Sequence, residues 1–339
     1  MYRHNGAGEM LVFSAADFED FLQPRPDLPD VMESELENVV RLLAQNRWPF
    51  RIHATYNESI TRFLNVFEKI NHEIPFNGLP WIFDHAETID VKNIERVKAL
   101  GGGIAIQSRM AFQGEYFTSR YGANAAQQTP PVKRILEMGV PVGAGTDATR
   151  VSSYNPWIAL YWLVSGKTVG GLTLYNETHR ISREEALELY TRGSAWFSNE
   201  QQKKGSIKVG MFADLTVLTS DYLSVADEDI KHIESDLTIV DGRIVYASGD
   251  FSSFSPDPIA VLPDWSPTII NPGYFSKNKI PFSSAAEVSF AKGGKSQIHH
   301  CVGSCNVHGH FHDVARKSDV PVDNYTAFCG VLGCSCFAF

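Results

Sequence analysis

RIHAT (residues 51–55), FDHAE (residues 83–87) and VGAGTDAT (residues 142–149) are the stretches of this sequence that decide its fold. Each is a short apolar run that ends near an ionisable residue: His53, His85 or Asp147. Helical periodicity follows the first two runs and precedes the third. Strands that alternate with helices of this length predict an α/β protein with a parallel sheet, either open or closed into a barrel.

The same alternation extends on both sides of these stretches. We expect strands at residues 50–55, 81–86, 103–107 and 140–145, and helices at residues 31–48, 59–70, 91–100, 131–138, 156–164 and 182–197. Ser182 and Glu185 have the spacing of a capping box at the start of the last helix. Residues 112–129 are expected to form loops, and no specificity code can be read from them.

From residue 205 the pattern changes to short β-type runs separated by turn residues. Asp241 and Gly242, between LTIV and RIVYA, predict a hairpin. We therefore expect a small β domain at residues 205–254, after an α/β domain at residues 1–204. Residues 255–339 are expected to form an extended arm and a His- and Cys-rich tail.

Composition excludes several functional classes. The chain has 339 residues, of which 43% are hydrophobic, so it can bury a substantial core. Its net charge of -9 and its lack of a basic cluster argue against nucleic acid as a partner. We found no apolar run long enough to span a membrane and no secretory leader, so we expect a cytoplasmic protein.

The three ionisable residues at the strand ends suggest a metal site. His53, His85 and Asp147 are separated by 32 and 62 residues, so only closure of a common sheet can bring them together. In parallel barrels the carboxyl ends of the strands carry the catalytic groups, and two imidazoles with a carboxylate suit a metal such as zinc. The alternative is that each histidine is a hydrogen-bonded core residue and that Asp147 caps a helix.

Taken in order, RIHATYNES, FDHAETI and GAGTDAT, followed by GSIKVGMFADLTVLTSD and LTIVDGRIVYASGD, resemble the closing section of the metal-dependent amidohydrolase superfamily. The resemblance covers about residues 31–250. It implies a TIM-type (β/α) barrel flanked by a β-sandwich to which the chain's last strands contribute. This chain would form about the C-terminal half of such a barrel.

The resemblance also assigns roles to individual residues. His53 and His85 would be metal ligands on the fifth and sixth strands. Asp147 would be the eighth-strand aspartate, which touches the metal and acts as general base and then general acid. Gln107 and Arg150 would face the same mouth and bind substrate, although Arg150 could equally be a surface loop residue. The implied cofactor is a divalent metal, zinc by preference.

The chain departs from the family pattern in two places. No His-x-His strand is found, and we expect no fourth-strand lysine or glutamate to bridge metal ions. Four βα units are expected, whereas a closed barrel has eight. We therefore expect a truncated form, or one that a homo-oligomer or a complementing N-terminal half completes, because a half barrel would expose strand edges.

The tail contains a dense set of potential ligands: His299, His300, Cys301, Cys305, His308, His310, His312, Cys329, Cys334 and Cys336. This density can bind zinc or copper, but its spacing matches no closed structural zinc site, so metal binding and a packed or partly disordered tail remain open.

Two functions are consistent with these observations. The first is hydrolysis of carbon–nitrogen bonds other than peptide bonds, by metal-activated water acting on a small amide, cyclic amide or formamide-like substrate. The second is a catalytically inactive or regulatory protein that keeps the scaffold.

Overall fold

The computed structural model describes residues 4–18, 21–148 and 151–257, and the backbone of residues 303–305 and 310–312. Its main sheet is parallel, with the strand order β1-β2-β3-β4. The strands are β1 Phe50–Ala54, β2 Trp81–His85, β3 Gly103–Gln107 and β4 Val142–Gly145. All four expected strands are present, and no end differs from its expected position by more than two residues.

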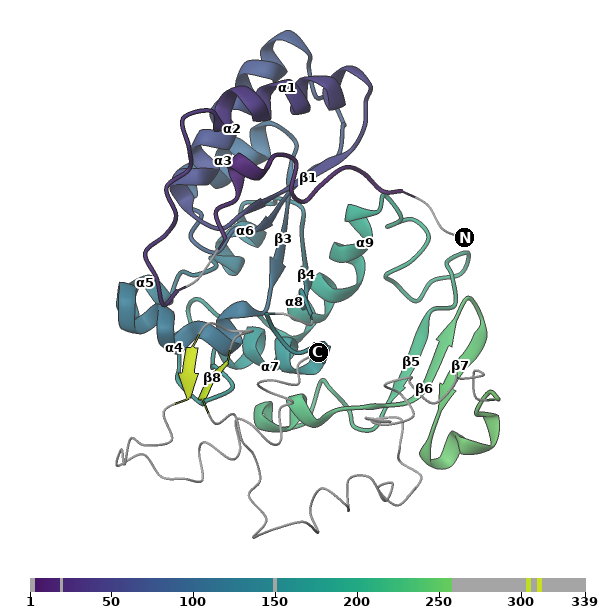
Figure 1. Cartoon of the computed structure of the whole chain (residues 1–339). Helices are drawn as coiled ribbons and strands as arrows, with labels where there is room; N and C mark the ends of the chain where they lie inside the picture. Colours follow the sequence, from purple (N-terminus) through teal and green to yellow (C-terminus); the bar gives the residue numbers. More distant parts are fainter. Residues whose placement is uncertain (1–3, 19–20, 149–150, 258–302, 306–309, 313–339) are drawn as a thin grey trace.

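Helices connect and cover these strands (Figure 1). They are α1 Met32–Gln45, α2 Asn57–Glu73, α3 Val91–Ala99, α4 Arg109–Tyr121, α5 Ala123–Ala126, α6 Val132–Glu137, α7 Pro156–Ser165, α8 Arg183–Glu188 and α9 Ser194–Phe197, with short 3-10 turns η1 Phe13–Ala15, η3 Asp227–His232 and η4 Gly249–Phe254. Helices α1, α2 and α3 pack side by side.

The strand order explains why the sheet resembles part of a barrel. Neighbours in sequence are also neighbours in the sheet, and the order never reverses. Because crossovers between parallel strands are almost always right-handed, such an order places the connecting helices on one face. A doubly wound open sheet instead reverses its order at a switch point. The arrangement is therefore consistent with a partial TIM-type barrel.

The core beneath β1 and β2 is a cluster of aromatic side chains. Trp81 packs edge-on against Phe67 at 5.1 Å and against Phe83 at 5.1 Å, and it stacks with Phe50 at 6.4 Å. Phe76 closes the group against Phe67 at 6.3 Å. Each of these rings is almost fully buried, so the apolar face of α2 anchors the two strands that carry His53 and His85.

One local expectation was wrong. Residues 109–121 form helix α4 rather than a loop, because its buried positions (Met110, Ala111, Gly114 and Phe117) repeat at helical spacing.

The expected helix at residues 182–197 is confirmed, with its capping box, but its middle residues form a π turn, η2 Leu189–Gly193. There Ser194 donates hydrogen bonds to the carbonyls of Ala144 and Leu189, both at 2.8 Å.

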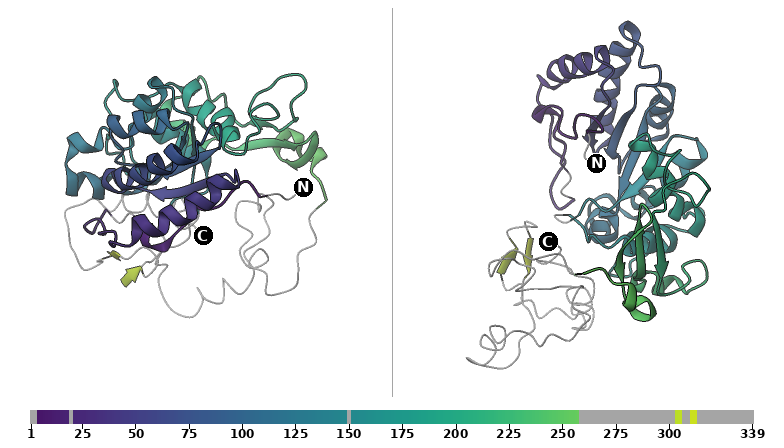
Figure 2. Two further views of the ribbon diagram at one scale, coloured as in Figure 1. Left: turned by 90° about the horizontal axis from the view of Figure 1, so that it is seen from above. Right: turned by 90° about the vertical axis from the view of Figure 1, so that its right-hand side faces the viewer.

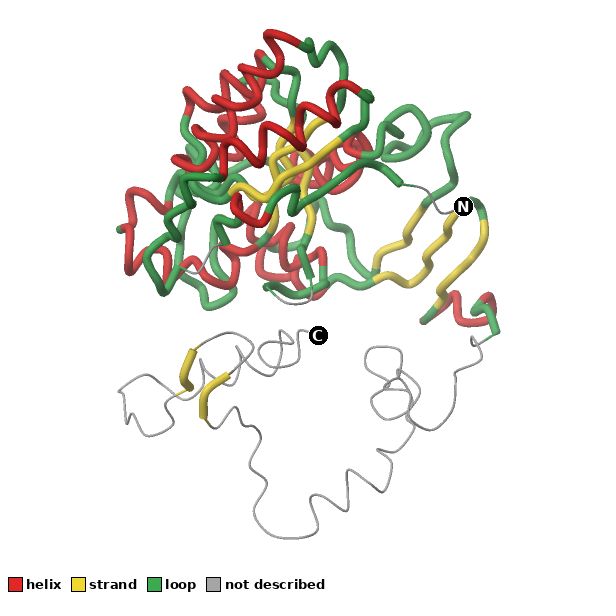
Figure 3. The backbone as a smooth tube through the Cα atoms, turned by 45° about the horizontal axis from the view of Figure 1, so that its top comes forward, coloured by secondary structure: helices red, strands yellow, loops and turns green. Residues whose placement is uncertain are grey.

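The β-type region forms a second sheet that stands apart from the first (Figure 3). It is antiparallel, with β5 Leu215–Leu218, β6 Ser235–Val240 and β7 Arg243–Ala247 in the order β5-β6-β7. The predicted hairpin is confirmed, with Asp241 and Gly242 both at positive φ. Within the described residues it is a single three-stranded layer, and the β-sandwich to which these strands were expected to contribute stays a prediction. Figure 2 shows both sheets from two further directions.

Most of the expected His- and Cys-rich tail lies outside the described residues. The part that is described has two short strands, β8 Gly303–Cys305 and β9 His310–His312, which pair in antiparallel fashion. None of the helices described is both long enough and apolar enough to cross a membrane.

Candidate metal site

A segment near the N-terminus extends the parallel sheet beyond β1. The backbone N–H of Ala7 donates to the Pro49 carbonyl at 2.9 Å, and that of Arg51 donates to the Ala7 carbonyl at 2.8 Å. The N–H of His53 then donates to the Glu9 carbonyl at 3.2 Å. Residue 8 is glycine because a Cβ there would lie 2.0 Å from the Arg51 carbonyl oxygen. The pairing brings Glu9 to the carboxyl end of β1.

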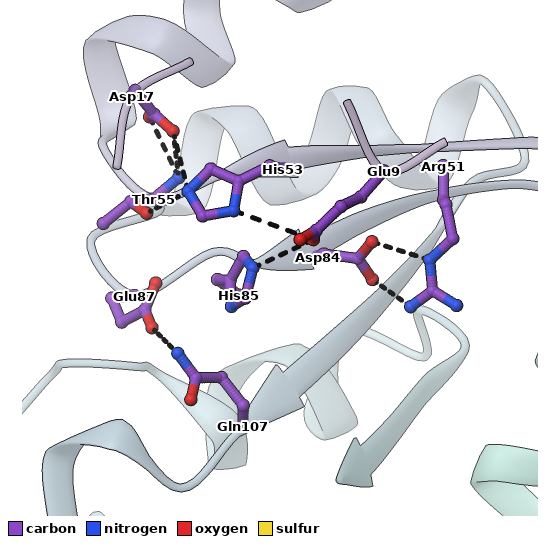
Figure 4. Close-up of polar contacts among 9 residues, drawn as sticks. All are labelled: Glu9, Asp17, Arg51, His53, Thr55, Asp84, His85, Glu87 and Gln107. Carbon is purple, nitrogen blue, oxygen red and sulfur yellow. Dashed lines mark hydrogen bonds and ion pairs between the residues drawn. The ribbon is translucent and has the colours of Figure 1, made fainter. Parts of the chain in front are cut away.

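Glu9, His53 and His85 converge there from three neighbouring segments (Figure 4). Glu9 Oε2 lies 3.2 Å from His85 Nε2 and 3.7 Å from His53 Nδ1. One potential ligand atom from each residue lies within 4.8 Å of the other two. A tetrahedral zinc ion bound at about 2.1 Å separates two of its ligand atoms by about 3.4 Å. The observed separations lie on either side of that value, so these three donors fit a metal ion.

The charges at this site support one another. The nearby ring of His53 and the hydrogen bond with His85 hold the pKa of Glu9 well below its ordinary value. Burial lowers the pKa of each histidine, but Glu9 and the other neighbouring carboxylates outweigh it and raise both pKa values. A cation is therefore stabilised at this point, either as an imidazolium or as a bound metal ion.

Asp17 lies behind His53, on the side away from Glu9. Its carboxylate is fully buried and accepts the backbone N–H groups of Thr55 and Tyr56, each at 2.9 Å. Asp17 Oδ1 also lies 3.5 Å from His53 Nε2, and Thr55 Oγ1 lies 3.3 Å from the same nitrogen. Burial raises the pKa of Asp17, although the charge of His53 and the backbone N–H groups oppose the rise.

The backbone is strained where β2 and β4 end. His85 and Ala86 are consecutive residues at positive φ (79° and 54°), and Asp147 has a φ of 52°. L-residues adopt this region uncommonly, although Asn, Asp and His do so more often than the others, and such strain gathers at functional sites. His85 ends β2 in this conformation, next to the two other donors.

Asp147 lies on the rim rather than among the converging donors. With Glu9, His85 and Gln107 it lines a cavity of about 200 Å³. Desolvation by neighbouring groups raises the pKa of its carboxyl group, while the charges of His85 and Arg109 act in the opposite direction. Asp147 is exposed. It is not in the group of described residues whose ligand atoms lie within 4.8 Å of one another.

The remaining expected site residues have different positions. Gln107 ends β3, is buried, and donates from Nε2 to Glu87 Oε1 at 3.0 Å. Burial raises the pKa of Glu87. Asp84, beside His85, accepts from Arg51 Nε at 2.6 Å. Arg150 lies outside the described residues.

Glu9 and Asp17 were not predicted from the sequence. Both residues lie in a stretch without periodicity, where only long-range pairing places them. The one local signal is Gly6-Ala7-Gly8 directly before Glu9, since paired glycines can mark a close approach of two backbones.

Comparison with known proteins identifies the chain's relatives. Residues 1–246 match the amidohydrolase family. The chain is 25% identical over 217 residues to YtcJ of Bacillus subtilis (strain 168), which is named as an amidohydrolase, covering 63% of this chain and 40% of that protein. It is 27% identical over 197 residues to N-substituted formamide deformylase of Arthrobacter pascens, covering 58% and 36%.

Solved structures show the same kind of partial overlap. An uncharacterised metal-dependent hydrolase from Pyrococcus horikoshii OT3 is similar over 58% of this chain and 39% of its own, with 23% identity and a TM-score of 0.49. The chain spans about two-fifths of the length of the curated relatives it matches. Since the family match covers well over half of the sequence, the chain belongs to the amidohydrolase family.

Proposed function

We propose that this protein is a metal-dependent hydrolase of carbon–nitrogen bonds other than peptide bonds. The observation that carries the proposal is the convergence of Glu9, His53 and His85 on one point beside a cavity that Asp147 also lines. One carboxylate and two imidazoles are a donor set that zinc accepts, with a position left open for water or substrate.

The chain's own residues then divide the chemical work. A bound divalent ion lowers the pKa of a coordinated water and polarises a carbonyl group. Asp147, on the rim of the same cavity, would take the proton from the attacking water and return it to the leaving amine.

Substrates of this protein would be small amides. Two relatives are named as N-substituted formamide deformylase and imidazolonepropionase, so N-substituted formamides and cyclic amides are the first compounds to assay. Gln107 would contact the substrate from β3, because it lines the cavity beside His85. Arg150, close to Asp147 in sequence, would bind a substrate carbonyl or carboxylate.

Metal binding is the first test of this function. The purified chain should bind about one zinc ion, measured by elemental analysis and calorimetric titration, and His85→Ala should lose it. His72→Ala, which changes an exposed histidine at the end of α2, is the matched control and should retain zinc. Equal zinc content in all three proteins would remove His85 from the site.

Activity is the second test. Asp147→Asn should retain zinc but lose hydrolysis of N-substituted formamides, because the amide cannot accept the proton. A second reading of the site is a metal-binding scaffold without catalysis, and the exposure of Asp147 outside the converging donors favours it. Zinc binding without turnover of any formamide or cyclic amide would support that reading.

A further inference from the structure

We infer that Asp17 is a positioning residue that fixes the tautomer of His53, so that Nε2 carries the proton and Nδ1 is the atom that binds metal. The inference rests on the proposed metal site but is read from a different set of contacts. It concerns how the chain prepares a ligand rather than which reaction follows.

The two ring nitrogens of His53 face different surroundings (Figure 4). Nδ1 points to Glu9 Oε2 at 3.7 Å, on the side where His85 Nε2 also lies near that oxygen. Nε2 points to Asp17 Oδ1 at 3.5 Å and to Thr55 Oγ1 at 3.3 Å. A metal ion between the three donors can therefore reach only Nδ1, and that nitrogen must keep its lone pair.

The contacts of Asp17 leave one orientation for its carboxylate. Oδ2 accepts the N–H groups of both Thr55 and Tyr56, each at 2.9 Å. Oδ1 shares the Thr55 N–H, at 3.1 Å, and is the oxygen nearest His53. Asp17 has no exposed surface, so solvent does not compete for this oxygen. Nε2 has two oxygens within 3.5 Å, whereas Glu9 Oε2, the carboxylate oxygen that faces Nδ1, lies farther away at 3.7 Å, so the proton is favoured on Nε2. A carboxylate behind a ligating histidine acts in this way in metal sites generally.

Asp17→Asn reverses the polarity of this contact with little change in shape. Only the amide oxygen can accept the two backbone N–H groups, so it takes the place of Oδ2. The NH2 group then faces Nε2 as a donor, and the proton of a neutral His53 ring moves to Nδ1. In that tautomer Nδ1 carries a hydrogen directed at the metal position.

The experiment reads the tautomer directly. Long-range 15N–1H NMR of the metal-free full chain, at alkaline pH where the ring is neutral, should show His53 protonated at Nε2. In Asp17→Asn it should show protonation at Nδ1. Zinc affinity should fall by about 10- to 100-fold in the same variant. A residue that only supported the fold would weaken binding without moving the ring proton.

Two controls keep the result interpretable. Asp90→Asn makes the same substitution at the N-cap of α3, away from His53. It should change neither the tautomer of His53 nor the zinc affinity. Thr55→Val removes the other oxygen near Nε2 and should leave the tautomer unchanged. A switch in Thr55→Val, or an Nδ1-protonated ring in the unaltered protein, overturns the inference. If the unaltered chain binds no zinc, the proposed metal site is wrong. The NMR measurement of the His53 tautomer still tests whether Asp17 fixes the position of the ring proton.

Discussion

Gly8 determines whether Glu9 can reach the two histidines. The backbone of residues 7–9 lies so close to β1 that any side chain at position 8 would collide with a carbonyl group of the strand. We predict that Gly8→Ala displaces Glu9 and weakens zinc binding by at least the tenfold change expected when a metal's surroundings are disturbed, about 1.4 kcal/mol. Calorimetric titration with zinc would measure the loss.

The matched control is Gly78→Ala. Gly78 also has a positive φ, of 74°, but a Cβ there would meet nothing within 4 Å. It therefore carries the backbone strain of the substitution without the collision, at a position outside the cavity. If Gly78→Ala weakens zinc binding as much as Gly8→Ala does, the close approach of residues 7–9 to β1 is not what places Glu9.

At the scale of the element, the π turn η2 brings the helical residues 183–197 into close contact with strand β4. Gly193, the last residue of η2, lies against β4 so closely that a Cβ would stand 2.4 Å from the Val142 carbonyl oxygen. We predict that Gly193→Ala lowers the free energy of unfolding by about 1–3 kcal/mol through overpacking. Urea denaturation followed by circular dichroism would measure it.

Thr191→Ala is the control within the same turn. Its side chain is exposed and donates only to the Leu187 carbonyl of its own helix. The substitution should change stability by no more than about 0.5 kcal/mol. If Gly193→Ala and Thr191→Ala lower the free energy of unfolding equally, the close contact of Gly193 with β4 does not account for the loss.

Secondary structure was predictable from the sequence wherever one segment carried its own pattern. The four strands, the capping box at Ser182 and the hairpin at Asp241 are examples. Helix α4 also carries its own pattern, because its buried residues repeat at helical spacing, although a loop was expected there. The π turn could not be read from residues 182–197 alone, because it depends on contacts with β4, a distant strand.

At the scale of the whole molecule, Glu228 links η3, which lies between β5 and β6 in sequence, to the α/β part of the chain. It lies on η3, which packs on α7, and it accepts hydrogen bonds from Tyr161 at 3.2 Å and from Lys167 at 2.8 Å. Because these contacts are largely exposed, we predict that Glu228→Gln lowers the free energy of unfolding by less than about 1 kcal/mol at neutral pH. Chemical denaturation would measure the difference.

The effect of Glu228 should depend on pH with a definite sign. Burial raises its pKa, but the hydrogen bonds from Lys167 and Lys231 outweigh this and hold the pKa at about 2, below the value of 4.5 for an unperturbed glutamate. Its stabilisation is therefore present above about pH 4.5 and is lost as pH falls toward 2. The difference between Glu228→Gln and the unaltered protein should vanish over that range; a difference that persists would contradict the assignment.

The candidate site shows what remains hidden from a single sequence. His53, His85 and Asp147 could be predicted as site residues because each lies at or near the end of an expected strand. Glu9 and Asp17 could not, because their positions depend on hydrogen bonds across 38 to 44 residues of chain, from β1 back to an irregular segment. Local periodicity carries no information about such pairings.

The two adjacent left-handed residues that end β2 have a cost that the whole chain bears. Each such conformation costs about 1 kcal/mol or more. That is a sizeable part of the free energy of unfolding of a folded domain. Substitutions that let His85 and Ala86 adopt an ordinary φ would raise the thermal stability of the protein. They would also let the imidazole of His85 move away from the two other donors. Directed evolution for thermostability alone would thus be expected to erode the very feature that makes the cavity useful.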